Sequence, residues 1–189
     1  MKNRIAGIET EYGIFPIPQN DYDLYIPFEA GKRRHIEFAC NGSRVYEDTG
    51  SHPEYAAPEC IGPSDAALYD AAGAVLMHRL FAGSEYELHR LNADEYGNTF
   101  GSHENYSVQT GLMREPGISL LVPMVLPFLV TRQIFAGTGY YYDGKFMISQ
   151  RAGFINSMVG TSTTNSRDRA IVNTKYEHHS STCDRFHLI

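Results

Sequence analysis

Residues 3–15 read NRIAGIETEYGIF, and their alternating pattern indicates the fold class. Successive side chains of a β-strand point to opposite faces, so every second residue from Ile8 to Ile14 shares one face, which is mostly apolar or aromatic. Glu9 and Glu11 lie next to each other on the other face. The stretch is therefore expected to be a strand with one core face and one face that carries carboxylates.

Two carboxylates on one strand face repel each other unless a cation joins them. Gly13, rather than a Lys or Arg, follows Glu9 and Glu11 on their face, so the pair has no local charge compensation. One interpretation is a solvated outer face. The other is a site for a hard divalent cation such as Mg²⁺, which prefers oxygen ligands.

The rest of the chain is expected to form runs of strands around two long helices. Helices are expected at 63–81, with Ser64 as N-cap, and at 118–136. Runs of strands that do not alternate regularly with helices predict an α+β fold with a largely antiparallel sheet. Strands are expected at 43–48, 53–60, 85–92, 102–109, 145–152, 168–174 and 184–189, and the first helix is expected to bury a stripe of Leu68, Ala71, Ala72, Val75, Leu76 and Leu80.

The most apolar run, Ile118–Val130, is too short for a membrane span. It has about 13 residues, whereas a span needs about 20. It is therefore expected to be a buried core helix, kinked at Pro127, because proline removes a backbone hydrogen bond and clashes with the preceding turn.

Composition limits the function. The chain has 189 residues, is 42% hydrophobic and has a net charge of −6, which argues against nonspecific nucleic-acid or membrane binding. Its three cysteines are widely spaced and form no CxxC pair, as is typical of a reducing cytosol. The first residues lack the apolar core of a signal peptide, so a cytoplasmic protein is expected.

Further polar clusters follow the first strand. Tyr46 and Asp48 share a strand face, and Glu54 lies on the next strand, although a hairpin with scattered polar residues has the same pattern. Arg132 and Arg151 are cations that suit phosphate oxygens, although isolated cations are more often surface residues. No glycine-rich phosphate loop or nucleophile elbow occurs. These residues together predict an oxygen-ligated metal on a sheet face, with an extra carboxylate as base.

Seven motifs occur in the order and spacing of one family. The sequence resembles the Pup–protein ligase and Pup deamidase family, the proteasome accessory factor A proteins. The motifs are Gly7–Gly13, Asn41–Tyr46, Asp48 with Gly50–Ala56, Tyr96–Asn98 with Gly101–Tyr106, Pro127–Gln133, Ile148–Arg151 and Val172–Thr174.

The resemblance implies a catalytic domain related to glutamine synthetase, with ATP and Mg²⁺ held over a curved antiparallel sheet whose helices pack on one face. A ligase of this family phosphorylates the C-terminal Glu side chain of Pup, a small protein modifier, and a substrate lysine then attacks the acyl phosphate. A deamidase converts a C-terminal Gln of Pup to Glu and also removes Pup from proteins. The implied partners are a Pup-like modifier and lysine-bearing proteins of a bacterial proteasome pathway.

The resemblance also implies roles for single residues. Asp48 matches the catalytic aspartate, which takes the proton of the attacking lysine in a ligase. The implied metal ligands are Glu9, Glu11, Tyr46 and Glu54, and the implied nucleotide-site residues are Glu104, Arg132, Arg151 and Asn173.

The chain departs from the family pattern at several places. Family members are more than twice as long, so residues 1–189 are expected to be the N-terminal part of their catalytic domain, incomplete and without an internal boundary. The family's arginine after Asn-Thr is Lys175 here, which puts the nucleotide end of the site in question.

The pattern also leaves the type of activity open. Gly50-Ser51 and the short stretch 14–40 favour a ligase, whereas Ala57–Cys60 is deamidase-like. A non-catalytic binding homologue and a small-molecule carboxylate–amine ligase on the same fold are also compatible with the sequence.

Overall fold

The computed structural model describes residues 4–16, 36–48, 50–162, 168–175 and 182–189. Residues 17–35 of the expected connection, and residues 176–179 after Lys175, lie outside this range. The chain divides into two compact units. The first unit comprises residues 1–91 and 100–104, and the second comprises residues 92–99 and 105–189.

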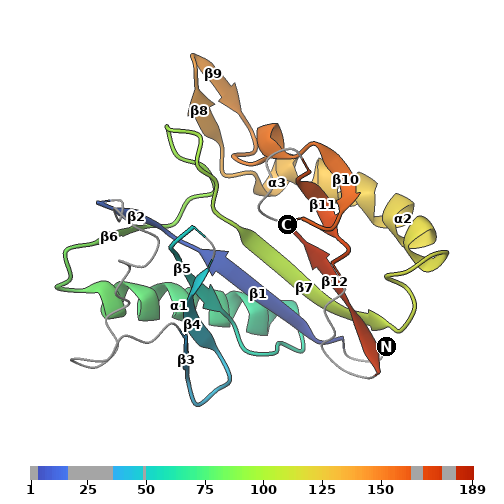
Figure 1. Ribbon diagram of the computed structural model, residues 1–189, viewed down its shortest axis with the longest axis horizontal. Helices are drawn as coiled ribbons and strands as arrows, with labels where there is room; N and C mark the ends of the chain where they lie inside the picture. Colours follow the sequence, from blue (N-terminus) through green and yellow to red (C-terminus); the bar gives the residue numbers. More distant parts are fainter. Residues whose placement is uncertain (1–3, 17–35, 49, 163–167, 176–181) are drawn as a thin grey trace. The chain divides into compact units, whose positions relative to one another are not determined.

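Antiparallel strands form the first unit (Figure 1). Strand β1 pairs with β5, β5 with β4 and β4 with β3, and a separate pair joins β2 to β6. Residues 102–104 of β7 also belong to this unit. The strands are β1 (Ala6–Glu11), β2 (Gly13–Phe15), β3 (Ile36–Phe38), β4 (Arg44–Asp48), β5 (His52–Ala56), β6 (Glu87–His89) and β7 (Ser102–Gln109).

Helix α1 (Pro63–Phe81) packs on β1 and β5 of the first unit (Figure 1). Its bounds confirm the expected helix, but the N-cap is Gly62 and not Ser64, because Pro63 begins the helix and fits its first turn. The expected buried stripe is wrong in part. The buried positions are Gly73, Met77 and Phe81, spaced four residues apart, whereas Leu68 and Val75 are exposed.

Gly73 decides which face of α1 is buried. A Cβ at this position would overlap the ring of Tyr55, so the glycine allows the aromatic ring of β5 to lie directly on the helix. Tyr55 joins Tyr12, Val45, Met77 and Phe81 in the core of this unit. Hydrophobic spacing alone does not reveal such a close approach, which explains why the predicted stripe was shifted.

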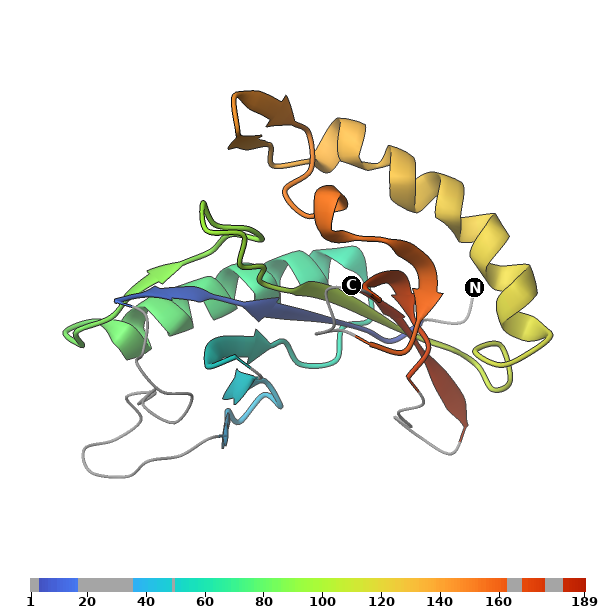
Figure 2. The same ribbon diagram turned by 45° about the horizontal axis from the view of Figure 1, so that its top comes forward.

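The second unit combines residues 105–109 of β7 with helices and strands from the rest of the chain. Strand β10 pairs with β11 in parallel, and β11 pairs with β12 in the antiparallel direction. The antiparallel hairpin β8–β9 follows the helices (Figure 2). The elements are α2 (Gly117–Thr131), α3 (Gln133–Ala136), β8 (Tyr140–Tyr142), β9 (Lys145–Met147), the 3₁₀ turn η1 (Ala152–Phe154), β10 (Ser157–Gly160), β11 (Ala170–Asn173) and β12 (Cys183–Leu188).

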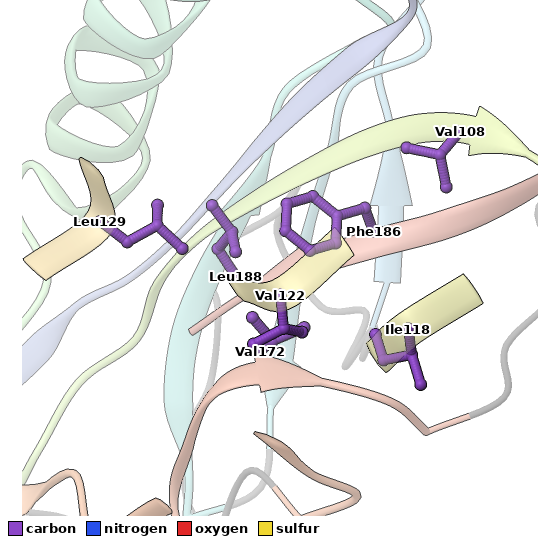
Figure 3. Packing of buried hydrophobic residues seen from close by; sticks show 7 residues of the cluster. All are labelled: Val108, Ile118, Val122, Leu129, Val172, Phe186 and Leu188. Atoms are coloured by element: carbon purple, nitrogen blue, oxygen red, sulfur yellow. The ribbon is translucent and has the colours of Figure 1, made fainter. Parts of the chain in front are cut away.

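One apolar cluster forms the core of the second unit (Figure 3). One face of α2 contributes Ile118, Val122 and Leu129, which lie against residues of the strands. Val172 of β11 is fully buried. The cluster also contains Val108, Phe186 and Leu188.

The helix expected at 118–136 matches the stretch that α2 and α3 occupy, but the expected burial of its apolar run at 118–130 is wrong in part. Helices α2 and α3 span Gly117–Ala136, a stretch of 20 residues with hydropathy 1.8, which by length and composition alone suffices to cross a membrane. Only 17% of the most apolar 18 residues of this stretch is buried. Helix α2 continues through Pro123 and Pro127, and its outward residues Leu120, Met124 and Phe128 are exposed.

The predicted α+β class with a largely antiparallel sheet is confirmed. Strands β10 and β11 pair in parallel, whereas the pairs β1–β5, β4–β5, β3–β4, β2–β6, β8–β9 and β11–β12 are antiparallel. The predicted strand at 102–109 matches β7 in its bounds, and the strand expected at 43–48 matches β4 to one residue. Strand β10 was not predicted. The single-domain expectation for 1–189 stays a prediction.

Candidate metal and acid–base site

Three carboxylates of the first unit meet on three neighbouring strands. Glu11 of β1, Asp48 of β4 and Glu54 of β5 each offer an oxygen within 4.8 Å of the others. The strand register explains this meeting, because Glu11 pairs with Glu54 across β1 and β5, and β5 also pairs with β4. Glu54 is 3% exposed and Glu11 9% exposed. Three acidic groups therefore share a small volume that is largely shielded from water.

The electrostatics of this group are unfavourable without a cation. Burial raises the pKa of Glu54 to about 8, and the charges of the surrounding carboxylates act in the same direction. A hydrogen bond with Tyr46 opposes this rise but does not cancel it. A carboxyl group with such a pKa holds a proton at neutral pH unless a positive charge replaces it.

Tyr46 lies directly beside Glu54. The two residues pair across β4 and β5, and their side chains are hydrogen-bonded. Burial, followed by the charges of Glu54 and Glu9, raises the pKa of the Tyr46 hydroxyl, so the phenol stays protonated and donates to the carboxylate. The Arg44 guanidinium lies over the Tyr46 ring, 4.4 Å from its centroid. Tyr46 therefore contributes a neutral oxygen at the edge of the three-carboxylate group.

Glu9 lies on β1 beside two basic side chains. Its carboxylate is 4.0 Å from Nη2 of Arg44 and 3.6 Å from Nδ1 of His103. Glu9 contributes to the negative potential that raises the pKa of Glu54. The predicted pair Glu9 and Glu11 thus has different surroundings, since only Glu11 shares the 4.8 Å group.

Hydrogen-bond donors hold the carboxylate of Glu11 on two sides. Nδ1 of His52 lies 3.1 Å from Oε2 of Glu11, and the Gly101 backbone also hydrogen-bonds the carboxylate. Burial raises the pKa of Glu11, but these hydrogen bonds and the nearby His103 outweigh it, and the net result is a lowered pKa. Glu11 is therefore ionised at neutral pH, while Glu54 is the carboxyl that holds a proton.

The donor set fits a hard divalent cation. Mg²⁺ prefers oxygen ligands, and carboxylates that would otherwise repel each other gain most from its charge. The raised pKa of Glu54 beside an ionised Glu11 is the observation that supports this fit. Glu11 and Glu54 would hold the ion, with the Tyr46 hydroxyl and the Asp48 carboxylate next to them.

The remaining predicted site residues occupy other places. Glu104 follows His103 on β7, so the two side chains leave opposite faces of the strand. Among the described residues, Glu104 does not join the three-carboxylate group. Its role at a nucleotide–metal site stays a prediction.

Three predicted nucleotide-site residues belong to the second unit. Arg132 follows the end of α2 and is half-buried. Arg151 precedes η1, and its backbone N–H donates to Oγ of Ser149 at 3.3 Å. Asn173 at the end of β11 is 2% exposed, and its Oδ1 accepts the Lys175 backbone N–H at 2.7 Å. Their phosphate-binding roles stay predictions.

His52 and His103 are the residues of this site to which the sequence assigned no role. Both lie inside motifs of the resembled family, but neither has a spacing that reveals its partner. His52 contacts Glu11, 41 positions away, and His103 lies beside Glu9. A useful signal is the dense polar run Ser102–Tyr106 within a strand, because a strand buried on one face rarely carries polar residues at successive positions.

Comparison with known proteins gives a consistent result. Residues 17–189 match the family described as Pup-ligase protein. The chain is 37% identical to a Pup–protein ligase of Bifidobacterium animalis subsp. lactis over 210 residues, and 39% identical to one of Bifidobacterium adolescentis over 197 residues. It is 37% identical to a Pup–protein ligase of Corynebacterium diphtheriae over 209 residues.

A solved structure is similar over almost the whole chain. It is the crystal structure of the complex between prokaryotic ubiquitin-like protein Pup and its ligase PafA, with a TM-score of 0.79 and 31% identity over 99% of this chain. The chain spans only 42% of that solved chain, and 41% of the Bifidobacterium animalis relative. The likeness supports the predicted α+β fold, and it covers less than half the length of these relatives.

Proposed function

The chain belongs to the Pup-ligase protein family, and we propose that it is the N-terminal part of a carboxylate–amine ligase. The proposed enzyme consumes ATP to join the side-chain carboxylate of the C-terminal Glu of a Pup-like modifier to a lysine of a protein substrate. The group formed by Glu11, Asp48 and Glu54 is the observation that supports this chemistry most directly.

The proposed reaction has two steps. The modifier carboxylate attacks the γ-phosphorus of ATP, which gives an acyl phosphate and ADP. The lysine amine then attacks the acyl carbon, and inorganic phosphate leaves as the isopeptide bond forms. When bound, Mg²⁺ supplies positive charge that stabilises phosphate oxygens.

Asp48 is proposed as the base of the second step. Its half-buried carboxylate lies within 4.8 Å of those of Glu11 and Glu54, where it is proposed to accept the proton that the attacking amine loses. A positioned general base contributes typically about 10²–10⁴-fold to a rate. Glu11 and Glu54, with Tyr46 beside them, are proposed to hold the metal, and Glu9 adds negative charge next to them. Glu104, Arg132, Arg151 and Asn173 are proposed as nucleotide contacts.

We place the enzyme in the bacterial cytoplasm, because the proposed reaction consumes ATP. The cysteines Cys40, Cys60 and Cys183 are all free, as is typical of a reducing compartment. One face of α2 packs into the core of the second unit, which favours a helix of a globular protein over a membrane span. The proposed partners are a Pup-like modifier and lysine-bearing proteins of a bacterial proteasome pathway.

A direct assay tests the proposal. The full-length protein is incubated with ATP, Mg²⁺ and a Pup-like peptide ending in Glu or Gln, and lysine adducts are detected by mass spectrometry. A ligase forms adducts with the Glu peptide, and Asp48→Asn is expected to lower their rate by about 10²–10⁴-fold. Glu59→Gln, at an exposed carboxylate, is the matched control.

Three further outcomes would each assign a different activity. Ammonia release from the Gln peptide without adducts indicates a deamidase. Neither product, together with an unchanged signal for Asp48→Asn, indicates a non-catalytic binding homologue. Adducts with a free amine in place of a protein lysine, and without the modifier peptide, indicate a small-molecule ligase.

A further inference from the structure

His52 is a half-buried histidine beside the three-carboxylate group, and the proposed reaction gives it no role. It begins β5, directly opposite Asp48 in the hairpin register, and its ring reaches the carboxylate of Glu11 on the neighbouring strand. One side chain thus lies between the proposed base and a proposed metal ligand. This position invites a functional explanation that rests on the function proposed above.

The direction of the hydrogen bond follows from the charge of Glu11. An ionised carboxylate has only acceptors, so at the 3.1 Å contact Nδ1 of His52 must carry the hydrogen. Each carboxylate oxygen has two lone pairs, and accepting one hydrogen bond leaves the oxygen able to bind a cation as well. The Gly101 backbone adds a second hydrogen bond, which limits rotation of the carboxylate.

The ring of His52 is itself held in place. Phe100 lies against it with ring centroids 4.7 Å apart and an interplanar angle of 48°. The turn before β5 also approaches it, because a Cβ on Gly50 would lie 3.4 Å from Nε2 of His52. Gly50 and Ser51 both have positive φ, +92° and 58°, and Oγ of Ser51 donates to Glu47 at 3.0 Å.

We propose that His52 is a positioning residue that donates a hydrogen bond from Nδ1 to Glu11 and thereby orients this carboxylate for divalent-cation binding. Side chains that orient metal ligands typically change metal affinity by about 10–100-fold when they are removed. His52 acts through Glu11 and does not itself touch the reacting groups.

Two substitutions separate the hydrogen bond from the packing. His52→Phe keeps an aromatic ring against Phe100 but removes the donor. His52→Asn keeps a donor at the position of Nδ1 but removes most of the ring. Binding of Mn²⁺ alone to the EDTA-treated full chain is measured by electron paramagnetic resonance of the free ion, with thermal unfolding as the control for folding.

The expected result is a dissociation constant that rises about 10–100-fold in His52→Phe and stays within about threefold of the native value in His52→Asn. Native-like affinity in His52→Phe overturns the proposal, because packing alone would then suffice. An equal loss in both variants overturns it as well. If the unsubstituted chain binds no Mn²⁺, the metal site of the proposed function fails, and this outcome is distinct from the other two.

A measurement on the unsubstituted chain keeps the proposal testable if a variant does not fold. The ¹⁵N chemical shifts of the His52 imidazole report which nitrogen carries hydrogen. We expect a hydrogen on Nδ1 in the metal-free protein. An Nδ1 without hydrogen overturns the proposal, because Glu11 would then receive no hydrogen bond from His52.

Discussion

Two buried carboxylates, one in each unit, have opposite surroundings. Asp184 in the second unit is 5% exposed, and its Oδ2 accepts the backbone N–H groups of Gly111 at 2.7 Å and Met113 at 3.2 Å. Glu54 in the first unit is 3% exposed and lies among other carboxylates. Backbone donors thus compensate Asp184, whereas the single hydrogen bond from Tyr46 does not offset the burial of Glu54 and the surrounding carboxylates. Burial alone therefore does not distinguish the two carboxylates, but the balance of donors and like charges around them does.

The comparison predicts a large loss of stability when Asp184 is removed. Asp184→Ala leaves two backbone N–H groups without their charged acceptor, and a hydrogen bond to a charged group contributes about 1.5–3 kcal/mol. We expect the free energy of unfolding to fall by about 3–4 kcal/mol. Urea denaturation measures it, and the loss should be the same with Mg²⁺ and with EDTA. A loss that depends on metal would contradict the structural role.

Glu54→Gln should have the opposite effect on the metal-free protein. Folding raises the pKa of Glu54 from 4.5 to about 8, so between these values the folded state retains a proton that the unfolded state has lost. The contribution of Glu54 to stability is therefore neutral below about pH 4.5, becomes increasingly unfavourable as pH rises and is fully unfavourable above about pH 8.

Urea denaturation in EDTA at pH 5 and pH 8 tests whether Glu54 lowers the free energy of unfolding as pH rises. At pH 8 we expect Glu54→Gln to be more stable than the native chain, by on the order of 2–4 kcal/mol, and at pH 5 the difference should be small. Mg²⁺ should reverse the order, because the native carboxylate binds the ion better than an amide. Glu59→Gln, at an exposed position, should change neither value. Equal stabilities at both pH values would show that Glu54 is compensated like Asp184.

Gly73→Ala probes the apolar packing of the first unit. Alanine is the better helix former by about 1 kcal/mol, but its Cβ would overlap the Tyr55 ring. Because strain in a close-packed core costs about 1–3 kcal/mol, we expect a net destabilisation of up to about 2 kcal/mol, measured by urea denaturation. Gly83→Ala is an unsuitable control because its φ is +83°. Ala71→Gly, at an exposed position of α1, reports the helix propensity alone. A stabilised Gly73→Ala chain would show that Tyr55 moves aside freely.

The smallest effect is expected on the outer face of α2. Met124 is 79% exposed, and its replacement by glutamine removes little buried area. We expect a change below about 0.5 kcal/mol in the free energy of unfolding. Val122→Ala, on the buried face of the same helix, should cost about 1–3 kcal/mol, since Val122 packs in the core cluster. Similar costs at both positions would indicate that the outer face is also covered.

Local patterns predicted much of the secondary structure. The alternation in 102–109 and the apolar residues after Pro63 indicated the bounds of β7 and α1, because both patterns depend on neighbours in sequence. The buried stripe of α1 and the burial of α2 were not predicted correctly. Each depends on what another segment places against the helix, such as Tyr55 against Gly73.

For the candidate site, the sequence likewise predicted the set of residues but not their individual surroundings. The pair Glu9 and Glu11, followed by Tyr46, Asp48 and Glu54, was recognised from residue types and motif order. The structure distinguishes the members of this set. Glu11 joins Asp48 and Glu54, whereas Glu9 lies between Arg44 and His103.

The sequence by itself indicated which residue types could bind a cation and where several strands and both long helices form, since both follow from residue type and local periodicity. Only the tertiary structure decided which carboxylate is ionised, which holds a proton and which histidine contacts the ionised one. The reason is physical: burial and cross-strand register set the pKa of Glu54 and bring His52 to Glu11 over 41 positions of sequence.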